Sequence, residues 1–220
     1  MNMTKKAIIM TTTIVSILLV GYALIGPILS QVEEPNFSVL SQHKNNIEVR
    51  AYEPMIVAEV EVKGKRDDAI GDGFRILADY IFGENIQNED IAMTAPVEQK
   101  SSEKISMTAP VQQTKSEDDS WLISFVMPKK YTLETLPKPK NSQIHFKKVP
   151  AKYFAVVRFS GTASQKNIDK NTQKLEAFIA EKGLQNTSLP KYAFYNPPIT
   201  LPFLRRNEVM VEIQKPTLSD

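Results

Sequence analysis

The chain has 220 residues, 42% of them hydrophobic and 24% charged, which is a normal composition for one globular domain or two small ones. The absence of cysteine excludes a disulfide framework, a thiolate metal site and covalent c-type haem attachment. Without Lys5 and Lys6 the 27 basic residues fall to 25, equal to the 25 acidic ones, and this balance gives no electrostatic reason to expect a nucleic-acid partner.

The first predicted element is a membrane-spanning helix. Residues 7–29 contain no charged residue, and about 20 apolar residues suffice to cross the core of a bilayer. Two lysines precede this run and two glutamates follow it, so the positive-inside rule predicts a cytoplasmic N-terminus and an exported remainder. We therefore expect residues 1–30 to be an uncleaved signal anchor in the inner membrane, residues 31–36 to be a linker, and the main domain to be periplasmic. A cleaved signal peptide is the alternative.

Next along the chain, residues 47–64 alternate between apolar and other side chains, which predicts a strand with a break near Pro54. The stretch 66–83 follows, with apolar residues at helical spacing, acidic residues in its first turn and a glycine at its end. The sequence therefore predicts a strand followed by an amphipathic helix. The apolar positions of that helix are Ile70, Phe74, Leu77, Ala78 and Ile81.

The same pattern returns 97 residues later, in residues 144–161. A second helical pattern follows it, with Ser164 as the expected N-cap and an end before Gly183. We infer an internal duplication of a strand-helix-strand-strand module. The identical pairs at this constant offset are Ile47 and Ile144, Ala58 and Ala155, Val60 and Val157, and Gly64 and Gly161.

The segment between the two helices contains Met-Thr-Ala-Pro-Val twice, fourteen residues apart. We expect two short strands there, with each proline at a strand edge or bulge because proline cannot donate a ladder hydrogen bond. The predicted fold class is α+β: a curved antiparallel sheet, open or closed as a distorted β-barrel, with one helix from each half packed against it. The expected strands of this part and of the C-terminal half are residues 91–99, 105–113, 121–128, 191–198 and 207–214.

Six blocks of the sequence, taken in order, resemble the SOUL haem-binding protein family. They are "YEPMIVAEVEV", "GFRILADYIFGEN", the doubled "MTAPV", "FVMPKKYTLETLPKP", "VPAKYFAVVRFSG" and "YNPP…PFLRRNEVMVEI", and they cover residues 37–213. The resemblance implies a duplicated α+β barrel flanked by two helices, similar to the effector-binding domains of gyrase-inhibitor-like proteins and drug-sensing regulators. It also implies reversible, non-enzymatic binding of haem or another tetrapyrrole in an apolar groove. We take residues 37–214 as this domain and residues 215–220 as a C-terminal tail.

The family's groove uses the first strand, the first helix and basic residues near them. Some relatives carry a further lysine in the loop before the last strand, whereas residues 197–203 contain none. Ordinary surface charge and ordinary core positions are the alternatives for the matching residues. By position, the resemblance assigns propionate contacts to Arg50, Lys63 and Lys65, and macrocycle contacts to Phe74, Leu77 and Ile81.

Tight binding of haem iron needs an axial ligand such as His, Met, Tyr or Cys. The weak candidates are His43, Met93 and Met107. His43 lies in a polar stretch that is typical of an exposed turn, and the methionines are better explained as pliable core fillers of two strands. His145 should begin a strand and face solvent. The metal ligand therefore stays unknown.

Two other classes of function stay open. A pocket for different planar or amphiphilic molecules would favour a carboxylate facing a cationic ligand, with Glu53, Glu59 and Glu98 as candidates. Catalysis has little support, because no Ser/His/Asp arrangement, zinc-protease motif or pair of acids on a helix stands out. We therefore expect a non-enzymatic, membrane-anchored module that binds haem or a related tetrapyrrole, with Arg205 and Arg206 supporting the fold through hydrogen bonds and ion pairs.

Overall fold

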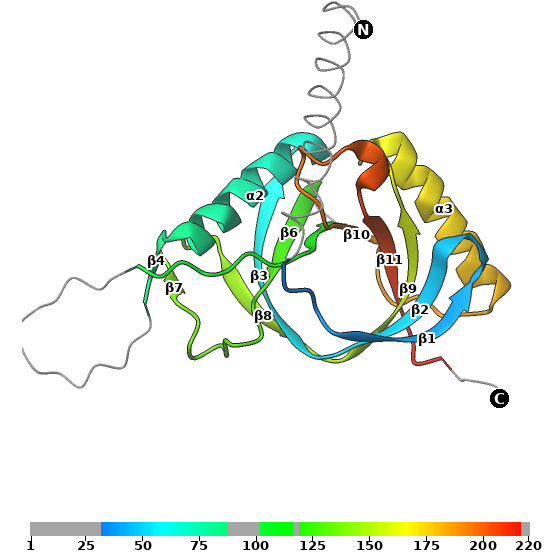
Figure 1. Cartoon of the computed structure of the whole chain (residues 1–220), viewed down its shortest axis with the longest axis horizontal. Helices are drawn as coiled ribbons and strands as arrows, with labels where there is room; N and C mark the ends of the chain where they lie inside the picture. Colours follow the sequence, from blue (N-terminus) through cyan, green and yellow to red (C-terminus); the bar gives the residue numbers. More distant parts are fainter. Residues whose placement is uncertain (1–31, 88–101, 117–118, 217–220) are drawn as a thin grey trace, which may run out of the picture.

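A curled antiparallel sheet organises the part of the chain that the computed structural model describes, residues 32–87, 102–116 and 119–216. Figure 1 shows two helices, α2 (Arg66–Phe82) and α3 (Gln165–Glu181), on the outer side of this sheet. The expected α+β class, with an antiparallel sheet and one helix from each half, is confirmed. The predicted anchor lies outside the described residues, and within them no helix has the length and apolar character needed to span a membrane.

Nine strands form the sheet in the order β1-β2-β9-β11-β10-β5-β6-β3-β8. The sheet curls into a half-barrel, and it stays open because β1 and β8 each pair on one side only. Two further strands, β4 (Asn85–Ile86) and β7 (Lys138–Pro139), pair with each other, and η1 (Lys44–Asn46) and η2 (Pro202–Leu204) are short 3-10 turns. The strands of the large sheet are β1 (Phe37–His43), β2 (Ile47–Tyr52), β3 (Met55–Lys63), β5 (Val111–Lys115), β6 (Ser120–Val126), β8 (His145–Val149), β9 (Lys152–Phe159), β10 (Lys191–Phe194) and β11 (Asn207–Ile213).

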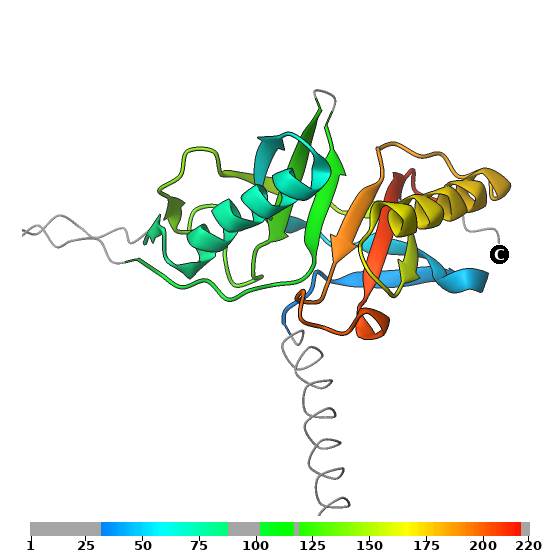
Figure 2. The same ribbon diagram turned by 90° about the horizontal axis from the view of Figure 1, so that it is seen from above.

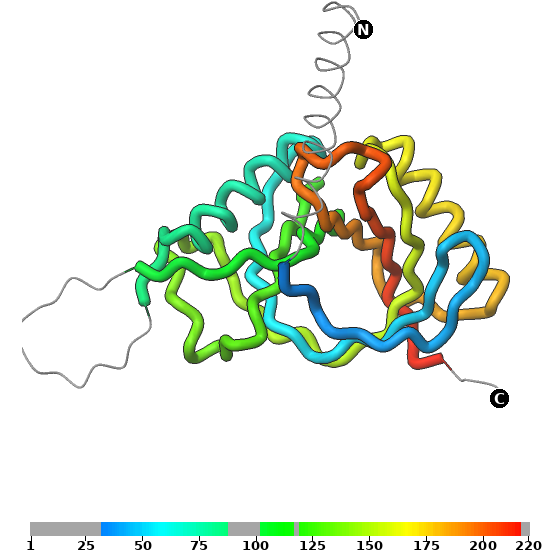
Figure 3. The backbone as a smooth tube through the Cα atoms, viewed as in Figure 1, coloured from blue at the N-terminus to red at the C-terminus, as the bar shows by residue number. Residues whose placement is uncertain are grey.

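The order of elements repeats along the chain: β2-β3-α2-β5-β6 is followed by β8-β9-α3-β10-β11. The repeated unit has one strand more than the sequence pattern indicated, because residues 47–64 and 144–161 each form two strands separated by a link that contains proline. The first strand of each unit pairs with the other unit, β2 with β9 and β8 with β3. This exchange can be followed along the backbone in Figure 3, and the pairing of β5 with β10 joins the two halves in the middle of the sheet.

The two helices differ in how they begin and how closely they approach the sheet. The Oγ atom of Ser164 accepts a hydrogen bond from a backbone N–H three residues further on, at 3.4 Å, so the predicted N-cap of α3 is confirmed. Lys65 gives α2 no side-chain cap. Instead α2 meets the sheet at Gly73, where an added Cβ would lie 2.8 Å from the side chain of Ile123. Gly83 ends α2 with a φ of 126°, a conformation that favours glycine.

Alternation along each strand separates an outer face from an inner face. On β3, Ala58 and Val60 belong to the core beneath α2, while Val57 and Glu59 belong to the inner face. A second large core lies between α3 and the strands β2, β9 and β11. The inner face carries a smaller buried cluster, whose members come mainly from β2, β9, β10 and β11. The inner face therefore has room for a site that the helices do not cover.

The Met-Thr-Ala-Pro-Val repeat is described in its second copy only. The strand expected over residues 105–113 begins later, at Val111, and the residues before it form one bridge, between Thr108 and Glu33. The peptide bond before Pro110 is cis, and this proline lies immediately before the strand, so its expected edge position is confirmed. The first copy, with the expected strand 91–99, lies outside the described residues.

Candidate functional site

The inner face of the curled sheet contains a groove that spans both halves of the molecule. Its volume is about 180 Å³, and we call it the central groove. Because neighbouring strands contribute every second residue to this face, side chains far apart in the sequence meet there. The main apolar side chains of its lining are Tyr52, Met55, Val57, Leu122, Phe154 and Met210, and the charged ones are Glu59, Lys147, Lys152 and Lys191.

Three lysines give the central groove a positive charge. The Nζ atom of Lys152 lies 2.6 Å from the carboxylate of Glu212, whereas no carboxylate in the described part of the chain lies at ion-pair distance from Lys147 or Lys191. Burial lowers the pKa of Lys191, and the charges of Lys152 and Lys147 lower it further against the opposing effect of Glu212 and Glu59. An anion bound beside Lys191 would therefore supply the counter-charge that this side chain lacks.

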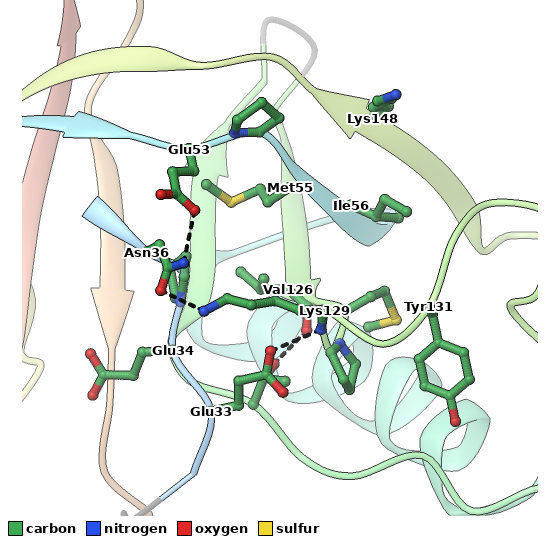
Figure 4. Close-up of a pocket in the computed structure, with 15 residues that line it drawn as sticks. Glu33, Glu34, Asn36, Glu53, Met55, Ile56, Val126, Lys129, Tyr131 and Lys148 are labelled. Carbon is green, nitrogen blue, oxygen red and sulfur yellow. Dashed lines mark hydrogen bonds between the residues drawn. The ribbon is translucent and has the colours of Figure 1, made fainter. Parts of the chain in front are cut away.

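A second hollow, of about 240 Å³, adjoins the central groove at Met55, which lines both. We call it the mouth pocket, and Figure 4 shows that the chain before β1 forms part of its wall. Asn36 Nδ2 donates a hydrogen bond to Glu53 at 2.7 Å, and the backbone N–H of Lys129 donates to Glu33 at 2.8 Å. The stretch expected as a linker is thus held against the domain, and these two carboxylates of the mouth pocket are engaged in internal bonds.

Arg50, on β2, lies on the inner face of the sheet next to β9, and it is 2% exposed. Its guanidinium donates to both carboxylate oxygens of Glu208, at 2.9 and 3.1 Å, and its Nε donates to Glu48 at 2.7 Å. Tyr195 Oη and Arg206 Nε donate to the same Glu208 carboxylate, at 2.9 and 3.0 Å. Arg50 is therefore committed to an internal ion pair, and the expected supporting role of Arg206 is confirmed.

This buried cluster keeps its charges over the ordinary pH range. Burial alone would raise the pKa of Glu208, but the hydrogen bond and charge of Arg50, together with Arg206, outweigh it and hold that pKa below its usual value. Burial, with the Glu208 charge, raises the pKa of Tyr52 to about 12 and raises the pKa of Tyr195 as well. These shifts all favour the charge states in which Glu208 is ionised and the two tyrosines are neutral, so the internal ion pair is kept near neutral pH.

The structure does not bring the six predicted tetrapyrrole contacts into one groove. Arg50 lies on the inner face, whereas Leu77 and Ile81 belong to the core beneath α2, on the other side of the sheet. The side chains of Leu77 and Ile81 are 0% and 2% exposed. Phe74 is 38% exposed on α2, where its ring meets a phenylalanine of β6 edge-on. Lys63 and Lys65 are exposed, at the end of β3 and just before α2. Binding by these residues stays a prediction.

The candidate metal ligands also lie apart. His43 was expected in an exposed turn, but it ends β1 and is half-buried, because its ring packs against Phe178 of α3 with the ring centroids 4.7 Å apart. Met107 is 41% exposed and precedes β5, so its expected place as a core filler of a strand is wrong, and Met93 lies outside the described residues. His145 is exposed, as expected. Among the residues that the structure describes, no group of three or more His, Cys, Asp or Glu side chains is arranged to hold a metal ion.

Sequence reasoning missed the lysines of the central groove. Lys147 and Lys152 stand on β8 and β9, and Lys191 stands on β10, so the three come together only through strand pairing and sheet curvature. One usable signal was the 97-residue offset, which places Lys147 at the position that Arg50 has in the first unit. Of the carboxylates considered for a cationic ligand, Glu59 lines the central groove, Glu53 lines the mouth pocket, and Glu98 lies outside the described residues.

Comparison with protein families assigns residues 32–212 to one model, described as SOUL heme-binding protein. This match covers more than half of the chain and includes the residues that line both hollows and, except for Ile213, both repeated units. A search of curated proteins found no match to this sequence.

Solved structures with a similar fold share little sequence with this chain. The EcmrR C-terminal domain has a TM-score of 0.55 at 9% identity, covering 79% of this chain and 99% of that one. A hydrolase from Listeria innocua has a TM-score of 0.51 at 14% identity, covering 80% and 94%. An uncharacterized conserved protein from Listeria innocua has a TM-score of 0.51 at 13% identity, covering 78% and 93%. At these identities the likeness shows the fold alone.

Proposed function

Because the chain belongs to the SOUL heme-binding protein family, we propose that it binds haem or a related tetrapyrrole without transforming it. The resemblance stated from the sequence is confirmed at the level of the family, and haem is the ligand that the family implies. We propose the central groove as the binding site. The observation that carries this choice is a half-buried lysine, Lys191, set in a largely apolar inner face without a carboxylate partner among the described residues.

The chemistry of the central groove suits an amphiphilic dianion. A tetrapyrrole with two propionates presents a broad apolar ring and two negative charges. Lys191 and Lys147 supply cations for the propionates, and the half-buried side chains of Met55, Leu122 and Val149 supply apolar surface for the ring. Hydrogen bonds to charged groups contribute about 1.5–3 kcal/mol each, roughly twice the contribution of neutral ones. Two such contacts together with a ring contact are enough for specific, reversible binding.

The central groove fits the organic part of haem better than its iron. Its lining has no histidine, Arg50 donates a hydrogen bond to the Tyr52 hydroxyl, and Met210 is 2% exposed in a packed cluster, so Met55 is the thioether that stays accessible. We therefore expect iron-free protoporphyrin to bind about as tightly as haem. A groove of about 180 Å³ is also smaller than the roughly 300–1,000 Å³ of sites that enclose drug-sized ligands, so one edge of the macrocycle stays in solvent.

Absorbance titration of the full chain in detergent micelles, with haem and in parallel with iron-free protoporphyrin, tests this proposal. We expect saturable one-to-one binding of both compounds. Lys191→Gln should weaken both about tenfold, because one charge-assisted hydrogen bond of about 1.5 kcal/mol corresponds to that factor. Lys65→Gln removes an exposed lysine outside the central groove and serves as the matched control with unchanged affinity.

Two outcomes would overturn parts of the proposal. Affinity that falls in Lys65→Gln or Lys63→Gln but not in Lys191→Gln would move the ligand to the residues around α2 that the resemblance suggested. A folded chain with no saturable binding of either compound would remove tetrapyrrole binding as the function. A lipophilic cation is the alternative ligand, with Glu59 as its partner, and tighter binding of a cationic dye than of protoporphyrin would favour it.

We propose further that residues 1–30 anchor the chain in the inner membrane and that the domain lies in the periplasm. The support is the uncharged run of residues 7–29 with lysines on its N-terminal side. Protease added to intact spheroplasts should digest the domain. Full protection in intact spheroplasts, with digestion after lysis, would overturn the predicted orientation.

A further inference from the structure

The loop between β10 and β11 exposes large apolar side chains. Phe203 is 70% exposed, Ile199 50% and Leu204 40%. Phe203 and Leu204 belong to the turn η2, and all three side chains stand within six residues of one another. Apolar side chains gathered at one exposed place mark a surface that meets another apolar phase. We call residues 199–204 the apolar loop.

Internal hydrogen bonds hold the apolar loop in its conformation. Arg205 Nε donates to the backbone carbonyl of Thr200 at 2.7 Å, and the same guanidinium donates to the carbonyl of Pro198. The backbone N–H of Gly161 donates to the carbonyl of Pro202 at 2.8 Å. These bonds tie the loop to its own ends and to the neighbouring turn after β9, so the exposure of its apolar side chains is a property of the fold.

The apolar loop also lies close to the place where the proposed anchor enters the domain. Arg206, two residues after Leu204, forms an ion pair with Glu34 at 2.9 Å. Figure 2 shows the loop on the side of the molecule where the described part of the chain begins. Leu29 is the last residue of the proposed membrane span, and the five residues from there to Glu34 span at most about 18 Å even when fully extended. A bilayer that contains residues 7–29 therefore has to lie within a short reach of the loop.

We infer that the apolar loop rests in the interfacial layer of the bilayer that residues 7–29 are proposed to span. This inference depends on the membrane anchor of the proposed function. Interfacial layers accept aromatic and aliphatic side chains next to polar backbone, and apolar groups typically enter them by roughly 5–10 Å. The anchor and the loop together hold the domain at two points, so the domain takes one orientation on the membrane.

The absence of cysteine makes the test direct, because every introduced cysteine is the only one in the chain. The full chain is reconstituted in liposomes as Phe203→Cys or Ile199→Cys, each labelled with a polarity-sensitive fluorophore. Leu189→Cys is the matched control, since Leu189 is 55% exposed but precedes β10, whereas the apolar loop follows it. We expect a blue shift, and loss of fluorescence with nitroxide-labelled lipids, at positions 203 and 199 and neither change at position 189.

The outcomes separate the anchor from the loop. Carbonate extraction first shows whether the chain is integral to the membrane. An integral chain whose labels at 203 and 199 behave like the label at 189 overturns the inference and leaves the anchor standing. A chain that carbonate removes from the liposomes overturns the anchor, and the inference with it.

Discussion

The two halves of the sheet place equivalent cations in unequal surroundings. Arg50 on β2 pairs with Phe154 of β9, and Lys147 on β8 pairs with Val57 of β3, so the two cations occupy matching positions 97 residues apart. Arg50 is bound by Glu208 of β11, at 2.9 Å. Lys147 instead lines the central groove.

The residue that each half has at the position of Glu208 explains the difference. Glu208 on β11 pairs with Arg158 of β9, and Leu122 on β6 pairs with Glu61 of β3, so Leu122 stands where the other half has its carboxylate. We call the half with the ion pair between Arg50 and Glu208 the closed half. We call the half in which Lys147 lines the central groove the open half. In this duplicated fold, the half in which the cation lacks an internal counter-charge is the half to examine for an anionic ligand.

The largest expected effect comes from breaking the closed half. Glu208→Ala leaves the buried Arg50 and the half-buried Arg206 without their shared carboxylate, so the free energy of unfolding should fall by about 3–5 kcal/mol. Glu59→Ala, on the inner face of the open half, should change it by about 0.5 kcal/mol or less. Urea denaturation followed by circular dichroism measures both variants. Equal effects of the two substitutions would contradict the distinction between a closed and an open half.

Acid should weaken the closed half through the same carboxylate. The pKa of Glu208 is lower in the folded chain than its ordinary value of about 4.3, so its stabilising effect is complete above that value and is lost as the pH falls through the folded pKa. We expect the difference in unfolding free energy between the native chain and Glu208→Ala to shrink below about pH 4.3. A difference that stays constant from pH 7 to pH 3 would show that the bridge does not depend on the charge of Glu208.

The helices provide a smaller contrast, because α2 approaches its half of the sheet at a glycine and α3 contains none. Gly73→Ala places a Cβ 2.8 Å from Ile123 and should lower the free energy of unfolding by about 1–3 kcal/mol. Gly71→Ala, with no atom within 4 Å, should raise it by about 0.5–1 kcal/mol. Thermal or urea denaturation of both variants separates the two effects, because Gly71→Ala changes helix propensity alone and Gly73→Ala changes helix propensity and close packing. If both substitutions raised the free energy of unfolding, the side chain of Ile123 would be able to move away from the new Cβ without destabilising the fold.

Leu122→Glu should make the open half resemble the closed one. The new carboxylate would stand at the position of Glu208 and place a negative charge in the central groove, so the affinity for iron-free protoporphyrin should fall about tenfold, which corresponds to about 1.4 kcal/mol. Leu122→Gln is the matched control, with the same size and no charge. The titration described above measures both variants, and equal affinities would show that the ligand does not use this face.

The sequence correctly predicted the helices whose apolar residues are strongly periodic and whose ends carry clear signals. The helix predicted over residues 66–83 is α2, and Ser164 and Gly183 bracket α3 as expected. β1 was missed because its polar side chains are partly solvated on both faces, which leaves no clean alternation. The break predicted near Pro54 separates β2 from β3, but each repeated unit was predicted with a single strand before its helix, so the extra strand in each unit was missed.

The sequence by itself determined the residue types, the two repeated units and the family to which they belong. Only the tertiary structure decided which charges meet. The resemblance assigned Arg50 a propionate contact by its position in the sequence, and the fold brings Glu208, 158 positions away, against it. Lys191 acquired its place in the central groove through the pairing of β10 with β5 and β11. Such pairings depend on packing between distant strands, and the spacing of residues along the chain does not encode them.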